Sequence, residues 1–129
     1  MKKVLLDTNV ILRLLIGDVP EQLSEAKQLF KEVESGLTTG LISILVINEL
    51  VWILENFYQK SRKDYLPLLQ KLFSLKNLKI LEIKKKDLLV IFKQMAETNL
   101  DFTDVYLWWL AQERKIKISS FDKKLLKIC

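Results

Sequence analysis

Residues 4–9 read Val4-Leu5-Leu6-Asp7-Thr8-Asn9, and they are typical of the first strand and helix start of an α/β fold. A run of three apolar residues is typical of a short strand that is buried on both faces of a parallel sheet. Asp7 ends the run and is suited to cap the helix that we expect over residues 10–16. A buried strand that leads directly into a helix is the repeating unit of α/β folds.

The same alternation continues along the chain. Further strands are expected over residues 37–42, 78–83 and 116–118. Further helices are expected over residues 20–35, 44–58, 63–75, 87–97, 101–114 and 121–126. The pattern predicts one domain over residues 1–129, a three-layer α/β/α sandwich around a central, mostly parallel sheet of about four to five strands.

The composition excludes several kinds of catalysis. The 129 residues contain no histidine and one cysteine, Cys129. Catalytic triads and histidine acid–base ribonuclease chemistry both need an imidazole, and structural zinc needs Cys or His ligands. An enzyme of this composition must therefore use carboxylates, lysines or hydroxyls, and Mg²⁺ or Mn²⁺ held by oxygen ligands becomes the expected class of cofactor.

The chain shows no export or membrane pattern. Asp7 interrupts the first apolar stretch too early for a signal peptide, and no apolar stretch approaches the roughly 20 residues that span a bilayer. We therefore expect a cytoplasmic protein without a membrane partner. The excess of 21 Lys and Arg over 16 Asp and Glu gives a formal net charge of +5, which supports an RNA partner only weakly.

Two of the expected strands end close to an aspartate. Asp7 follows residues 4–6, and Asp122 follows residues 116–118. Ligands of open parallel sheets bind outside the carboxyl ends of the strands, although a single aspartate there is more simply explained as a helix cap. Two interpretations therefore remain open for each aspartate: it belongs to a ligand site, or it caps the helix that follows.

Three acids on expected helices extend this set. Glu49 lies in the apolar helix 44–58, where it is either buried with a partner or part of a narrow solvated stripe. Asp101 and Asp104 lie three residues apart at the start of a helix and share one face. The helix dipole explains Asp101 well and Asp104 less well, because Asp104 leads into an apolar segment.

Convergence of the acids at one edge of the sheet would need a counter-charge. Like charges in one pocket repel and raise one another's pKa, and a divalent cation removes that penalty. Such an ion also lowers the pKa of a bound water, so no histidine is required. The acids in this hypothesis are Asp7, Glu49, Asp104 and Asp122.

Four segments, in the same order, resemble the motifs of PIN domains and especially of VapC-type toxin ribonucleases. These segments are residues 4–12, 43–54, 101–105 and 120–125. The resemblance implies a metal-dependent endoribonuclease that leaves a 5′-phosphate and a 3′-hydroxyl after attack by metal-bound hydroxide. It also implies a homodimer and, for a toxin of a toxin–antitoxin pair, a cognate antitoxin protein that blocks the site.

The resemblance further implies a role for each site residue. One or two Mg²⁺ or Mn²⁺ ions would be held by Asp7, Glu49, Asp104 and Asp122. Asp7 and Asp104 would bind directly, whereas Glu49 would act through water or as a proton acceptor. The carboxylates would be oriented by Asn9 and Ser120. Asp101 is a candidate for an acid that supports the metal ligands without binding the ion itself, although its place at the helix start explains it more simply.

The sequence departs from the family pattern at three places. Leu125 replaces an aromatic residue, and Ser120 replaces the commoner threonine. Trp108 and Trp109 stand where the family has small residues, and core or dimer contacts explain them better than base stacking. Three alternatives remain: an RNA-processing PIN nuclease without an antitoxin, a non-catalytic α/β interaction module, and a receiver-like domain, for which the acidic pair near the first strand is missing.

Overall fold

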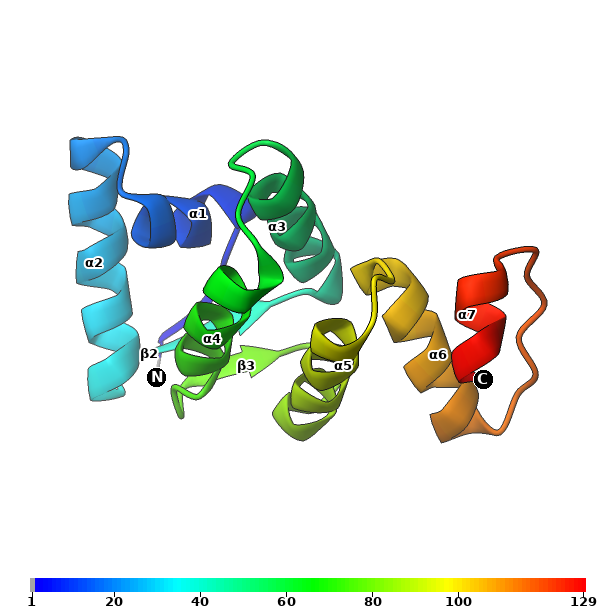
Figure 1. Ribbon diagram of the computed structural model, residues 1–129. Helices are drawn as coiled ribbons and strands as arrows, with labels where there is room; N and C mark the ends of the chain where they lie inside the picture. Colours follow the sequence, from blue (N-terminus) through cyan, green and yellow to red (C-terminus); the bar gives the residue numbers. More distant parts are fainter. Residues whose placement is uncertain (1) are drawn as a thin grey trace. The chain divides into compact units, whose positions relative to one another are not determined.

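A computed structural model describes residues 2–129 of the chain (Figure 1). The strands are β1 (Lys2–Leu5), β2 (Thr38–Ile42) and β3 (Leu78–Ile80). The helices are α1 (Thr8–Ile16), α2 (Pro20–Ser35), α3 (Ile44–Asn56), α4 (Arg62–Phe73), α5 (Lys85–Glu97), α6 (Phe102–Arg114) and α7 (Lys123–Ile128). The described residues fall into two compact units, one ending at Lys85 and the other running from Lys86 to Cys129.

The first unit contains a parallel sheet in the order β1-β2-β3. Lys2 is paired with Thr38 across β1 and β2, and Gly40 is paired with Leu78 across β2 and β3. Helix α2 packs against β2, and α1 packs against both α2 and α3 (Figure 1). The predicted α/β class, with a parallel sheet flanked by helices, is confirmed.

Gly40 lies at the most crowded point of this sheet. A Cβ atom there would lie 3.0 Å from Leu78 Cδ1, 3.3 Å from Leu6 Cδ1 and 3.4 Å from Val33 Cγ2. These three side chains come from the neighbouring strand, from the residue after β1, and from α2. Because Gly40 has no side chain, residues of α2, of β3 and of the end of β1 can pack closely around the centre of β2.

The sheet is smaller than the sequence predicts. Residues 116–118 form no strand, so the described residues contain three strands in place of the four to five expected. The amide of Ile116 instead donates to the carbonyl oxygen of Ala111 at 2.9 Å, which closes the end of α6. A strand forms only when a neighbouring strand supplies the other half of its hydrogen bonds. The alternation of apolar residues along a sequence does not show whether such a neighbouring strand is present.

The burial predicted for the first strand is also wrong. Leu6 is 2% exposed, but Leu5 is 66% exposed and Val4 is half-buried. Within the first unit, β1 is paired with β2. Successive side chains of a strand point to opposite faces, and the burial of Leu6 beside the exposure of Leu5 shows that one face is more covered than the other.

The helix predictions are accurate because the caps are local signals. Pro20 starts α2, and Gly36 ends it in the left-handed conformation at φ 88°. Ser43 caps α3 by accepting from the Leu45 amide at 3.2 Å. The buried side of α3 is made by five apolar residues, Ile44, Ile47, Leu50, Val51 and Leu54.

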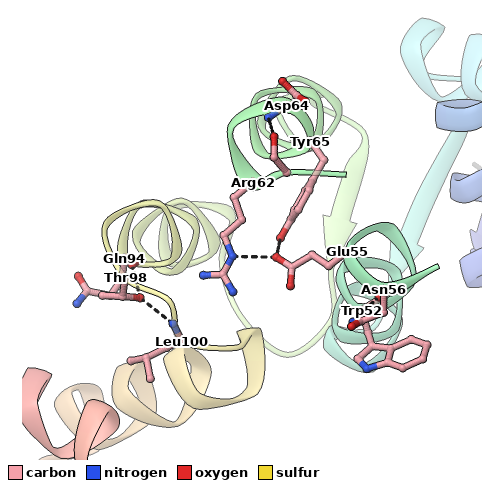
Figure 2. A network of polar contacts seen from close by, with 10 residues as sticks. Trp52, Glu55, Asn56, Arg62, Asp64, Tyr65, Gln94, Thr98 and Leu100 are labelled. Atoms are coloured by element: carbon pink, nitrogen blue, oxygen red, sulfur yellow. Dashed lines mark hydrogen bonds and ion pairs between the residues drawn. The ribbon is translucent and has the colours of Figure 1, made fainter. Parts of the chain in front are cut away.

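A buried polar group joins α3 to α4 (Figure 2). Tyr65, which is 2% exposed, donates its hydroxyl hydrogen to Glu55 Oε2 at 2.5 Å. Arg62 Nε donates to the same oxygen at 2.8 Å. Burial and the adjacent carboxylate strongly raise the pKa of Tyr65, so the phenol stays protonated and remains a donor.

The second unit is helical. Phe92 of α5 and Phe102 of α6 pack with ring centroids 6.4 Å apart. Thr98 stabilises the turn between these helices, since its hydroxyl donates to the Gln94 carbonyl at 2.9 Å and accepts from the Leu100 amide at 3.3 Å (Figure 2). Helix α7 packs against α6. Across the described residues, no helix is both long and apolar enough to cross a membrane.

Candidate active site

Asp7 lies at the carboxyl end of β1, as the sequence predicts. Its side chain caps α1 by accepting from the Thr8 amide at 2.8 Å, and the residue is exposed. One carboxylate oxygen thus fixes the side chain at the turn between strand and helix. The helix-cap explanation is confirmed, and it is compatible with a ligand role because a carboxylate has a second oxygen.

Asn9 lies in the first turn of the same helix and is exposed. It lines a shallow groove between α1 and α2, with Arg13 and Gln22 among the other lining residues. The predicted role of Asn9 in orienting carboxylates stays a prediction.

Glu49 lies on the outer side of α3. It is exposed, and so are Leu45 and Trp52, which are 74% and 62% exposed and share its helix face. The sequence left two interpretations of Glu49 open. The one that places it in a solvated stripe of the helix is confirmed, and the one that buries its carboxylate is wrong. The buried apolar residues of α3, among them Ile47, Leu50 and Val51, lie on the opposite side of the helix, in the core.

A further carboxylate at this end of the sheet was not found from the sequence. Glu82 follows β3 and accepts from the Ser43 hydroxyl at 2.6 Å and from the Ile44 amide at 2.7 Å. It therefore binds the N-terminus of α3, where the helix dipole favours negative charge. The only available sequence signal was the position of an acid two residues after a strand, a pattern that Glu82 shares with many surface acids.

Asp101 and Asp122 act on Asp104 within the second unit. Burial and then the charges of Asp101 and Asp122 raise the pKa of the Asp104 carboxyl, with a backbone hydrogen bond at Asp101 acting in the opposite direction. Asp101 occupies the N-cap position of α6 but makes no side-chain capping bond. The simple helix-cap explanation of Asp101 is therefore incomplete, since its carboxylate also acts on Asp104.

Asp122 caps α7 and is exposed. Its Oδ1 accepts from the Lys124 amide at 2.9 Å and from the Leu125 amide at 3.4 Å. Ser120 Oγ accepts from the Asp122 amide at 2.9 Å. The serine thus orders the backbone of the aspartate, which is the kind of support that the sequence suggested, although it acts on the amide rather than on the carboxylate.

The acids proposed from the sequence belong to both units. Asp7 and Glu49 lie in the first unit, and Asp104 and Asp122 lie in the second. Within each unit taken alone, the described residues form no group of three or more acidic or thiol side chains that could hold a metal ion. Convergence of all four carboxylates stays a prediction, and the donor set itself, made only of oxygen ligands, suits Mg²⁺ or Mn²⁺.

The two tryptophans that depart from the family pattern are half-buried on α6. The ring of Trp109 is stacked on Tyr106 with centroids 6.0 Å apart, and Tyr106 is stacked on Phe102 at 6.5 Å. Trp109 therefore belongs to an aromatic row along the helix. This arrangement supports the packing explanation for Trp109 over base stacking.

Comparison with known proteins gives one positive result. The family model described as PIN domain matches residues 4–129, a range that includes residues of both units. None of the curated proteins compared with the chain matches it. PIN domains are typically nucleases and generally use divalent metal ions. Since the match extends over nearly the whole sequence, the chain belongs to the PIN-domain family.

Proposed function

We propose that this PIN domain is a Mg²⁺- or Mn²⁺-dependent endoribonuclease. The observation that carries the proposal is the match of the family over residues 4–129 together with acids at all four motif positions. The chain has no histidine, so an imidazole cannot act as the general base. Carboxylates are the remaining groups able to hold a hard metal ion, and such an ion when bound activates water and neutralises charge on phosphate oxygens.

Each residue of the proposed site has a physical basis for its role. Asp7 is fixed by the first amide of α1, which leaves one carboxylate oxygen available. Asp104 lies near two other acids, and its pKa is raised first by burial and then by the charges of Asp101 and Asp122, which a bound cation would offset. Asp122 is fixed by the first turn of α7. These three side chains would hold the ion, while Glu49 in its exposed position would act through water or accept a proton.

We further propose that the nuclease is the toxin of a toxin–antitoxin pair. Support comes from the likeness of residues 4–12, 43–54, 101–105 and 120–125 to VapC-type motifs. The partners of this proposal are an RNA substrate, a second copy in a homodimer and an antitoxin that blocks the site. Induced expression is expected to slow growth, and Asp7→Asn is expected to abolish that effect. Unchanged growth on expression of the wild-type chain would contradict the toxin assignment, and arrest that persists with Asp7→Asn would contradict the role of Asp7.

The decisive experiment measures cleavage of single-stranded RNA by the purified chain. Activity is expected with Mg²⁺ or Mn²⁺ and not with a chelator. Asp7→Asn and Asp104→Asn should each lower the rate by about 100-fold or more, because each removes a charge that the ion needs. Glu97→Gln, an exposed acid at the end of α5, is the matched control and should leave the rate unchanged. Cleavage that persists in chelator would refute the metal mechanism.

A further inference from the structure

Phe121 is the most exposed large apolar side chain among residues 2–129, with a relative exposure of 105%. Four of the six phenylalanines are buried, namely Phe30, Phe73, Phe92 and Phe102. Phe57 is also exposed, but its ring packs on Tyr58 with centroids 4.8 Å apart. The ring of Phe121 makes no such contact with any described residue. It is therefore a free aromatic surface in contact with solvent.

The position of Phe121 matters more than its exposure, because single apolar residues are ordinary on protein surfaces. Phe121 lies between Ser120 and Asp122, two residues of the proposed site, and all three belong to the second unit. Ser120 Oγ accepts from the Asp122 amide at 2.9 Å, and Asp122 Oδ1 accepts from the Lys124 amide at 2.9 Å. Leu125 is 2% exposed and anchors the helix that follows. The ring is thus presented from a turn whose backbone is fixed.

Two positive charges come directly after this turn. Lys123 and Lys124 are both exposed, and among residues 2–129 neither ammonium group takes part in a hydrogen bond or an ion pair. Single-stranded nucleic acids are bound by this combination, because ammonium groups attract the phosphates and aromatic rings stack on the bases. The chemistry of residues 121–124 therefore matches RNA better than it matches an uncharged apolar partner.

We propose that Phe121 stacks on an unpaired base of the RNA substrate, at the nucleotide next to the phosphate held at Asp122. This inference rests on the proposed function, because it takes Asp122 as a ligand of the metal ion. Phe121 and Asp122 are neighbours in the chain, so their Cα atoms lie about 3.8 Å apart. A nucleotide whose phosphate lies at Asp122 has its base within reach of the ring, while Lys123 and Lys124 attract the flanking phosphates.

Stacking at Phe121 selects for single-stranded RNA. A base inside a duplex is already paired and stacked, and turning it onto a protein ring costs that stacking. Every base has a flat aromatic face, so one ring accepts all four bases with similar affinity. Phe121 is therefore a specificity-determining residue for unpaired nucleotides rather than for a base sequence.

Fluorescence anisotropy with a labelled single-stranded RNA tests the stack by binding alone. All chains carry Asp7→Asn, which is expected to prevent cleavage, and Mg²⁺ is present. Phe121→Leu keeps an apolar side chain without a ring and should weaken binding about 10-fold, whereas Phe121→Tyr should bind as the parent does. Phe57→Leu is the matched control at the end of α3 and should change nothing. Equal binding by Phe121→Leu and the parent, or no binding by the parent, would overturn the proposal.

An oligomer of the same length without bases separates the ring from the charges. The parent should bind this abasic oligomer about as weakly as Phe121→Leu binds the intact RNA, and Phe121→Leu should bind both oligomers alike. Lys123→Ala should instead weaken the binding of both oligomers and reduce the dependence on salt. An effect of Phe121→Leu that is equally large on the abasic oligomer would contradict stacking on a base.

Steady-state cleavage by chains with Asp7 intact separates the stack from the nuclease proposal. Phe121→Leu should raise KM about 10-fold and leave kcat near the wild-type value, because stacking binds substrate and transition state alike. A wild-type chain without activity would refute the nuclease proposal, and the anisotropy would still decide the stack. Loss of an oligomer on Phe121→Leu, measured by light scattering, would make the ring a protein contact and overturn the proposal.

Discussion

The Ser43 hydroxyl donates a 2.6 Å hydrogen bond to the carboxylate of Glu82, and this contact joins the end of β2 to the end of β3. The same carboxylate accepts from the first amide of α3 at 2.7 Å. Three elements that meet at the carboxyl edge of the sheet are thereby held by one side chain. The contact lies at the N-terminus of the helix that carries Glu49.

Replacement of Glu82 should destabilise the first unit. Glu82→Ala removes two hydrogen bonds and a negative charge from the N-terminus of α3, so we expect a loss of about 1 kcal/mol in the free energy of unfolding. Urea denaturation followed by far-ultraviolet circular dichroism measures the change. Glu25→Ala, at an exposed acid of α2, is the control and should change stability little. Equal effects of the two substitutions would show that the Glu82 contacts contribute nothing.

The Glu55–Tyr65 hydrogen bond should show energetic coupling. Tyr65→Phe keeps the buried ring but removes the hydroxyl, and we expect it to cost about 1–2 kcal/mol because the acceptor is charged. Glu55→Gln and the double variant complete a double-mutant cycle in denaturant unfolding. Costs that simply add would show that the 2.5 Å contact does not stabilise the pair.

A side chain at Gly40 should strain the centre of the sheet. Gly40→Ala places a methyl group 3.0 Å from Leu78 Cδ1, and overpacking of this kind costs about 1–3 kcal/mol. The loss is measured as a lower Tm in a thermal melt. Leu78→Val removes the contacting methyl, so the double variant should lose less stability than the two single effects added together. Full additivity would indicate that the strain does not arise at Leu78.

Asp104 should destabilise the metal-free protein at neutral pH. Its pKa is raised in the folded state, so the folded chain binds this proton more tightly than the unfolded chain does. The contribution of Asp104 to stability therefore falls as pH rises from below the ordinary value of 3.8 through the raised value. Asp104→Asn should raise Tm at pH 7 in chelator, with a difference that disappears toward pH 3. A lower Tm for the variant at pH 7 would contradict the unfavourable burial of the Asp104 charge beside Asp101 and Asp122.

The helices and the chemical class follow from the sequence because their signals are local. Ser43, Gly36 and Asp122 mark helix ends through contacts with residues next to them in the chain. The absence of histidine excludes imidazole catalysis in any fold. The four motifs led to the PIN family by the order of their residues alone, and the family match confirms that assignment.

Other features depend on partners that are distant in the sequence. Within the first unit, the pairing of β1 with β2 and the exposed side of α3 that carries Glu49 both depend on which surfaces find a neighbour. Ser43 and Glu82 are 39 residues apart, and no pattern at either position indicates the other. The helix ends, the oxygen-only chemistry and the family could all be predicted from neighbouring residues and from composition. The strand pairing of the first unit and the interactions among the acids could not, because hydrogen-bond pairing and burial require two surfaces to meet in space.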